Sequence, residues 1–289
     1  MTPFEFMIPT SLSQAIDLLD ADDPSVRPIA GGTALMLMMK AGVFRPRKLV
    51  NLSAIEPRYF TTEVGPSGLR IGAMMSLAKL ERSAEVQREA PVINRTLRLL
   101  SNIRVRNVAT VGGHLAHADP HMDLPPVLIA LGAQVLVIGP SGSRLIPVEE
   151  LYVGYFETVL ARNELIAELI IPRQTRRRSA YVKCTTRAAH DWPDLGVAVS
   201  LETDATAIRD ISIVASAATE KPTRLVAAEK AMRGGRLSEA LLRDTAEAAA
   251  KEVVVIADAR GSAPYKEQLV RVYVERALQN ALQLDPRKG

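Results

Sequence analysis

Ile29-Ala30-Gly31-Gly32-Thr33 and Thr110-Val111-Gly112-Gly113-His114 are the two stretches from which the fold of this chain can be worked out. In each, a glycine pair stands between an apolar run typical of a β-strand and a run typical of a helix. Glycine lets the backbone adopt positive φ and brings bare amide groups close to a ligand. Successive amides at a helix start make a site for an anion such as pyrophosphate. A lone pair is usually only a turn, but two pairs in matching contexts favour a cofactor held between two lobes.

The composition limits the class of protein. A chain of 289 residues predicts two or three domains, and a hydrophobic fraction of 47% with only 4% aromatic residues predicts an aliphatic core. The formal net charge of +4 is too small to indicate nucleic-acid binding. The single cysteine, Cys184, excludes an internal disulfide and a four-cysteine metal site within this chain, and it fits a reducing compartment. The first residues show no signal peptide and no apolar run is long enough to span a bilayer, so we expect a cytoplasmic protein.

Hydrophobic periodicity divides the chain into three regions. Residues 1–59 are expected to form a small α/β lobe, in which Ser11 and Gln14 make a capping box for the first helix. The other elements expected there are strands at 26–30 and 48–52 and a short helix at 35–40.

Residues 60–175 are expected to form a second α/β lobe. Asp123 has the position of a helix N-cap, with Pro125 in the first turn of a helix that runs to Leu131. The other elements expected in this lobe are a helix capped by Ser76, a helix at 91–101, and strands at 69–73, 134–138 and 165–171.

Residues 176–289 are expected to form a C-terminal region with three strands followed by two long helices. The basic run from Arg173 to Arg178 is interpreted as a solvated linker at the boundary, and contact with an acidic partner is the alternative. The expected strands cover 180–186, 195–202 and 210–217, and the expected helices cover 238–252 and 265–282.

Polar residues crowd the segment after the second glycine pair: His114, His117, Asp119, His121 and Asp123. Imidazole and carboxylate groups are good zinc or iron ligands. Their spacing fits no ligand template, so a polar loop beside a ligand is the favoured interpretation and no metal is assigned. The chain contains no Gly-x-Gly-x-x-Gly, no Gly-Lys-Ser/Thr and no Gly-x-Ser-x-Gly motif. A nucleotide cofactor would therefore need a fold other than the Rossmann or P-loop fold.

Three motifs together resemble a known family. They are Ala30-Gly31-Gly32-Thr33, the run from Ile103 to Gly113, and Asp123-Leu124-Pro125-Pro126-Val127-Leu128. They are similar to the FAD-binding medium subunit of molybdenum hydroxylases, a group that includes the medium subunit of aerobic carbon monoxide dehydrogenase and the flavin domain of xanthine dehydrogenase. Tyr181-Val182-Lys183 with Arg187, and the stretch from Asp258 to Tyr265, resemble the C-terminal region of that family, so the likeness spans nearly the whole chain.

The resemblance implies an α+β protein with a two-lobed, vanillyl-alcohol-oxidase-like (PCMH-type) FAD-binding fold and a C-terminal α+β domain with a small antiparallel sheet. FAD is the cofactor expected on this chain. By the family pattern the first glycine turn holds the pyrophosphate and flavin side, Lys183 lies near the flavin, and Leu100 and Ile166 line it. The residues expected to bind the cofactor are Pro28, Ile29, Ala30, Gly31, Gly32, Thr33, Ala34, Leu35, Leu100, Thr110, Val111, Gly112, Gly113, His114, His117, Asp119, Asp123, Ile166 and Lys183.

Two positions depart from the family pattern. His114 stands where the family usually has asparagine, and Thr33-Ala34 stand where the carbon monoxide dehydrogenase type has His-Ser. The second departure argues against carbon monoxide oxidation.

The function implied is electron transfer within an oxidoreductase. The chain would take electrons from a small [2Fe-2S] subunit and pass them from FAD to an acceptor such as NAD, a quinone or oxygen. The molybdopterin-type molybdenum cofactor would lie on a large subunit, in a dimer of heterotrimers, and no catalytic residue is assigned on this chain. The alternatives are a self-standing FAD-dependent oxidoreductase with its own small-molecule substrate, and a non-catalytic binding or assembly module.

Overall fold

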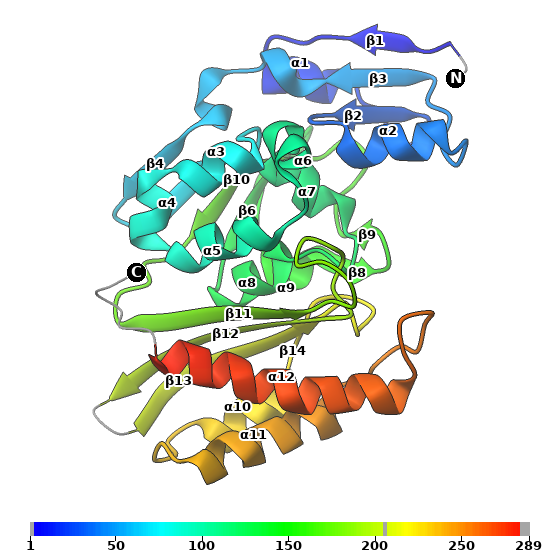
Figure 1. Cartoon of the computed structure of the whole chain (residues 1–289). Helices are drawn as coiled ribbons and strands as arrows, with labels where there is room; N and C mark the ends of the chain where they lie inside the picture. The colour runs from blue at the N-terminus through cyan, green and yellow to red at the C-terminus, as the bar shows by residue number, and fades with distance from the viewer. Residues whose placement is uncertain (1–2, 205–206, 284–289) are drawn as a thin grey trace.

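The computed structural model describes residues 3–204 and 207–283. The elements form an N-terminal lobe, a central lobe and a C-terminal domain, which follow one another from top to bottom in Figure 1. Across the part of the chain that the structure describes, no helix is both long enough and apolar enough to cross a membrane.

The N-terminal lobe is built on a parallel sheet with strand order β1-β3-β2. Its elements are β1 (Glu5–Met7), α1 (Leu12–Asp17), β2 (Val26–Ile29), α2 (Thr33–Lys40), β3 (Lys48–Asn51), and the 3₁₀ turns η1 (Leu52–Ala54) and η2 (Pro57–Phe60). Ser11 caps α1 as predicted, because its hydroxyl accepts from the Gln14 amide at 3.1 Å. The Gln14 side chain accepts from the Thr10 amide instead of the Ser11 amide, so the reciprocal half of the capping box is wrong.

The central lobe is an antiparallel sheet with strand order β4-β5-β10-β6-β7, covered by short helices. Its strands are β4 (Thr62–Gly65), β5 (Gly68–Gly72), β6 (Gln134–Gly139), β7 (Gly142–Pro147) and β10 (Leu165–Ile171). Its helices are α3 (Leu77–Arg82), α4 (Ala84–Glu89), α5 (Pro91–Leu99), α6 (Ile103–Val108), α7 (Val111–His117), α8 (Leu124–Ala130) and α9 (Val148–Leu151), and β8 (Tyr152–Gly154) pairs with β9 (Glu157–Thr158).

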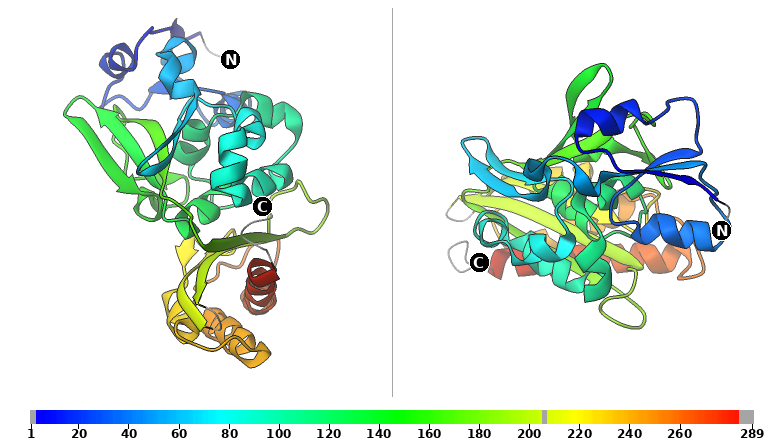
Figure 2. Two further views of the ribbon diagram at one scale, coloured as in Figure 1. Left: turned by 90° about the vertical axis from the view of Figure 1, so that its left-hand side faces the viewer. Right: turned by 90° about the horizontal axis from the view of Figure 1, so that it is seen from above.

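The C-terminal domain is an antiparallel sheet with strand order β11-β12-β13-β14. Its elements are β11 (Arg177–Cys184), β12 (Leu195–Asp204), β13 (Ala207–Ser216), β14 (Thr223–Arg224), α10 (Val226–Met232), α11 (Glu239–Glu252) and α12 (Ala263–Gln283). The side view in Figure 2 places this sheet between the central lobe and the helices α10 to α12. Ala198 and Val214 pack into the core of the central lobe, whereas their strand neighbours Val197, Val199 and Ala215 pack with the helices of the C-terminal domain, as the alternation of a strand requires.

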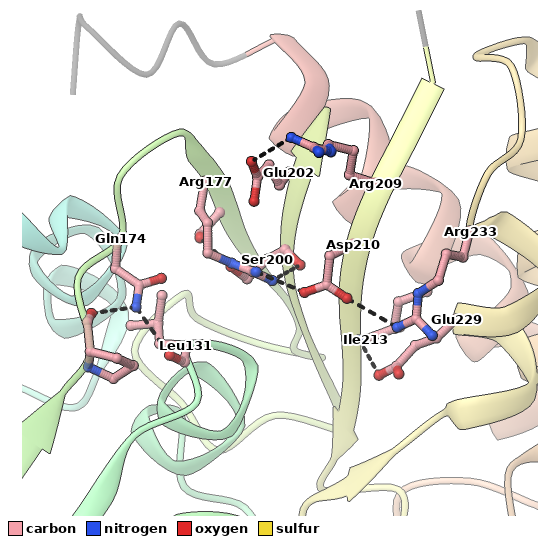
Figure 3. Close-up of polar contacts among 12 residues, drawn as sticks. Leu131, Gln174, Arg177, Ser200, Glu202, Arg209, Asp210, Ile213, Glu229 and Arg233 are labelled. Carbon is pink, nitrogen blue, oxygen red and sulfur yellow. Dashed lines mark hydrogen bonds and ion pairs between the residues drawn. The ribbon is translucent and has the colours of Figure 1, made fainter. Parts of the chain in front are cut away.

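The last two residues of the basic run, Arg177 and Arg178, belong to β11, so the interpretation of Arg173 to Arg178 as a solvated linker is wrong for these two. The Arg177 guanidinium donates to Asp210 Oδ2 at 2.8 Å and to Ser200 Oγ at 3.0 Å, and Asp210 also accepts from Arg233 at 3.0 Å (Figure 3). Arg178 donates to the Leu282 carbonyl at 2.9 Å. These contacts hold β11 within its own domain.

Candidate FAD site

The two glycine pairs lie against each other, although they belong to different lobes. A Cβ atom on Gly31 would lie 1.9 Å from the Val108 carbonyl oxygen, and one on Gly113 would lie 3.7 Å from the Ala30 Cβ. Gly31 is therefore required by the close approach of the β2–α2 turn to the end of α6. The structure brings together the two motifs that the sequence marked as one site.

The first turn has a row of free amide groups. Gly32 has a φ of 70°, the left-handed conformation that favours glycine, and it begins α2 without a side-chain cap. Among the described residues, the amides from Ala30 to Leu35 donate to no protein acceptor. Unpaired amides at the start of a helix attract an anion, so the predicted pyrophosphate cradle fits this turn.

The second glycine pair is different, because its amides are already used. Those of Val111 and Gly112 donate to the carbonyls of Met75 and Ala73 at 3.0 and 2.7 Å, and those of Gly113 and His114 donate to the Thr110 hydroxyl and carbonyl at 3.2 and 2.9 Å. The expected strand before this pair is also wrong, since 103–108 is the helix α6 and the pair lies in the first turn of α7. The proposed amide cradle at Thr110 to His114 therefore fails, while a contact of these residues with the cofactor stays a prediction.

Asp123 and Lys183 form a buried ion pair between the central lobe and the C-terminal sheet. Lys183 Nζ lies 3.0 Å from Asp123 Oδ2 and donates also to the Leu99 carbonyl at 3.0 Å, and the Tyr181 hydroxyl donates to Asp123 Oδ1 at 2.6 Å. Burial raises the pKa of Asp123, and the lysine and tyrosine oppose that shift. Asp123 does begin α8, but its carboxylate makes no capping bond, so the predicted capping role is wrong.

The histidines of the segment from His114 to Asp123 have different environments and do not converge on one point. Burial lowers the pKa of His114 to about 4, so this ring is neutral at pH 7, and its Nε2 atom is buried without a protein partner. Burial also lowers the pKa of His117, whose ring packs on Phe156 with centroids 5.3 Å apart. His121 instead lies 3.0 Å from Asp119 through Nδ1 and stacks on Trp192. Burial alone would raise the pKa of Asp119. The hydrogen bonds from His121 outweigh this effect and lower that pKa below its usual value.

A cavity of about 800 Å³ opens next to these groups. Three separate segments line it: Ser101, Asn102, Thr186, Arg187, His190, Asp191, Trp192, Ala259 and Arg260. Leu100, expected to line the flavin, directly precedes the first of them, and it lies with Ile166 in the core of the central lobe. Arg187 and the stretch from Asp258 to Tyr265 could be recognised in the sequence as family motifs. That both contribute to one cavity could not be predicted from the sequence.

The comparisons with known proteins agree with this geometry. Residues 2–174 match the family model described as the FAD binding domain in molybdopterin dehydrogenase, and residues 180–281 match the CO dehydrogenase flavoprotein C-terminal domain. The chain belongs to the family of FAD-binding subunits of molybdopterin dehydrogenases. The predicted family, the fold class and FAD as the cofactor are thereby confirmed, and the chain is a flavoprotein of the oxidoreductase class.

Known members of this family align with nearly the full length of this chain. The glyceraldehyde dehydrogenase medium chain of Sulfolobus acidocaldarius is 29% identical over 95% of this chain and 96% of its own length. The nicotine 6-hydroxylase medium subunit of Paenarthrobacter nicotinovorans is 33% identical, with coverages of 94% and 95%. A chain of carbon monoxide dehydrogenase from Hydrogenophaga pseudoflava superposes with a TM-score of 0.93 at 31% identity, over 98% of this chain and 99% of that one.

Proposed function

We propose that this chain is the electron-transfer subunit of a molybdenum hydroxylase complex, taking electrons from an iron–sulfur subunit and passing them from FAD to an external acceptor. The observation that carries the proposal is the row of unpaired amides from Ala30 to Leu35 at the contact between two lobes. That arrangement suits a dinucleotide cofactor, and the full-length relatives are medium subunits of multi-subunit dehydrogenases and hydroxylases.

FAD, when bound, supplies the redox chemistry, and the residues of this chain bind and orient it. The amides of Gly31 to Leu35 would hold the pyrophosphate by charge-assisted hydrogen bonds. The neutral ring of His114 would add a hydrogen-bonding group with no charge, because its pKa of about 4 lies well below neutrality. The buried pair of Asp123 and Lys183 fixes the C-terminal sheet over the central lobe, so the cavity beside Leu100 keeps its shape.

The partners proposed are a small [2Fe-2S] subunit and a large subunit with the molybdenum cofactor, assembled as a dimer of heterotrimers. The buried, unpaired thiol of Cys184 supports placing the chain in the reducing cytoplasm. The acceptor proposed is NAD, a quinone or oxygen. Thr33-Ala34, in place of His-Ser, supports an organic substrate for the complex over carbon monoxide.

A self-standing flavin oxidoreductase is the second candidate, favoured by the cavity of about 800 Å³, which would hold a small organic molecule. Purification of the tagged chain from its native extract, with a visible spectrum of the product, separates the two. The proposal expects flavin together with a cluster-bearing small subunit and a large molybdenum subunit. Yellow protein that purifies alone and oxidises an added substrate would establish the second candidate instead.

A further inference from the structure

The stretch from Asp258 to Gly261 forms a tight turn that closes one side of the cavity. The Asp258 amide donates to the Gly261 carbonyl at 3.1 Å and the Gly261 amide donates back to the Asp258 carbonyl at 3.2 Å. Just before the turn, the Ile256 amide donates to the Ala218 carbonyl at 2.8 Å. Because both of these hydrogen bonds join backbone groups, the Asp258 carboxylate and the Arg260 guanidinium are free to contact other residues.

Lys266, in the first turns of α12, is a fully buried cation with no role in the site described so far. Its side chain is 1% exposed, and its Nζ donates to the Ile256 carbonyl at 2.8 Å and lies 2.8 Å from Asp258 Oδ2. A buried ammonium is costly unless it is paired and hydrogen-bonded. Both partners lie just before Ala259 and Arg260, which line the cavity. The contacts of Lys266 therefore stabilise the position of the segment that forms this side of the cavity.

The contacts continue from Asp258 into the cavity. Asp258 Oδ1 accepts from the Arg260 amide at 2.9 Å. The Arg260 guanidinium then donates to the Trp192 carbonyl at 2.9 Å and to Asp194 Oδ1 at 3.0 Å. Arg260 and Trp192 both line the cavity, and Trp192 also stacks on His121 with ring centroids 5.5 Å apart. One chain of ion pairs and hydrogen bonds therefore joins α12 to the loop before β12.

We infer that Lys266 is a positioning residue for the flavin cavity: through Asp258 and Arg260 it holds the loop that carries Trp192 in its place beside the bound cofactor. This inference rests on the proposed function, since it takes the cavity beside Leu100 as part of the FAD site. Lys266 itself does not line the cavity, so it acts on the cavity through Asp258 and Arg260, two residues of the turn.

The test uses the full chain, stripped of flavin, and the variant Lys266→Met, which keeps the length of the side chain without its charge. Trp192 is the one tryptophan of the sequence, so intrinsic fluorescence reports directly on the cavity loop. Trp192 is 57% exposed and stacks on His121, so we expect the Trp192 emission of Lys266→Met to change in intensity as that stacking is lost. FAD titrated against that fluorescence should bind about tenfold more weakly, because only about a tenth of the variant molecules would then hold the loop in its binding-competent position. Lys266→Arg should restore both readouts to within about twofold of the wild type.

The matched control is Arg271→Met, on the same helix but paired with Glu247 of α11. It should leave the emission and the FAD affinity unchanged, because it lies outside the chain of contacts. Asp258→Asn keeps an oxygen for the Arg260 amide and removes the ion pair, so it decides the matter if Lys266→Met does not fold. Wild-type emission and FAD affinity in Lys266→Met, or equal effects of Arg271→Met, would overturn the inference. A wild-type chain that binds no FAD would overturn the proposed function instead, while the emission change would still test the positioning role.

Discussion

Replacing Gly31 by alanine tests the contact between the lobes at the point where the flavin site depends on it. The new Cβ would lie 1.9 Å from the Val108 carbonyl oxygen and 2.9 Å from the Ala109 Cα, both of them backbone atoms. The turn would have to move back by about 1.5 Å to reach ordinary van der Waals contact. Overpacking of this kind costs about 1–3 kcal/mol of unfolding free energy.

A shift of that size takes the amides from Gly31 to Leu35 out of hydrogen-bonding range of an anion placed for the wild-type turn. Each charge-assisted bond lost weakens binding by about 1.5–3 kcal/mol, or about 10- to 150-fold in the dissociation constant of FAD. Flavin titration of the apoprotein measures the dissociation constant, and urea unfolding measures the stability. Gly65→Ala is the matched control, since nothing lies within 4 Å of the added Cβ and its φ is not positive. Wild-type FAD affinity in Gly31→Ala would refute the reasoning.

Three further predictions follow from the site. His114→Asn should make the free energy of unfolding depend less on pH between about 6.5 and 4. The pKa of His114 falls from 6.5 to about 4 on folding, so the wild type loses stability as the pH falls through this range. Urea unfolding at about pH 7 and about pH 4.5 should show the wild type losing about 2 kcal/mol more than the variant, and equal losses would exclude this role. Lys183→Met should cost about 3–5 kcal/mol by leaving Asp123 buried without its cation, and adding Asp123→Asn should recover part of it in the same unfolding assay; no recovery would count against the pair. Acid precipitation should release intact FAD into the supernatant, whereas flavin kept in the pellet would contradict non-covalent binding.

The sequence predicted the elements with clear periodicity and missed those that depend on distant partners. Strand β1 was not predicted, because Glu5, Phe6 and Met7 are all exposed and carry no alternating pattern. The run from Ile103 to Val108 alternates like a strand but forms a helix. Asn102 caps that helix, and the buried Arg106 pairs with Glu81 at 2.9 Å and donates to the Leu100 and Ser101 carbonyls.

The candidate site shows the same division. The first glycine turn could be recognised locally, since positive φ at Gly32 and a helix start are properties of a few adjacent residues. The hydrogen bonds from the amides of the second pair to Met75 and Ala73 could not be predicted from the sequence. The pairing of Asp123 with Tyr181 and Lys183 could not be predicted either, because all these partners lie far away along the chain. The cavity, assembled from three separate segments, is visible only once the chain is folded.

The division of labour between this chain and its partners is the central claim, and anaerobic flavin reduction tests it most directly. The flavin-loaded chain is mixed with candidate purines, N-heteroaromatics, aldehydes and carbon monoxide, and bleaching of the flavin is followed with and without the iron–sulfur and molybdenum subunits. We expect the isolated chain to stay oxidised with every substrate, and the flavin to bleach with the substrate of the complex once both subunits are present. Bleaching by any of these substrates in the isolated chain would contradict the electron-transfer role and establish a self-standing oxidoreductase.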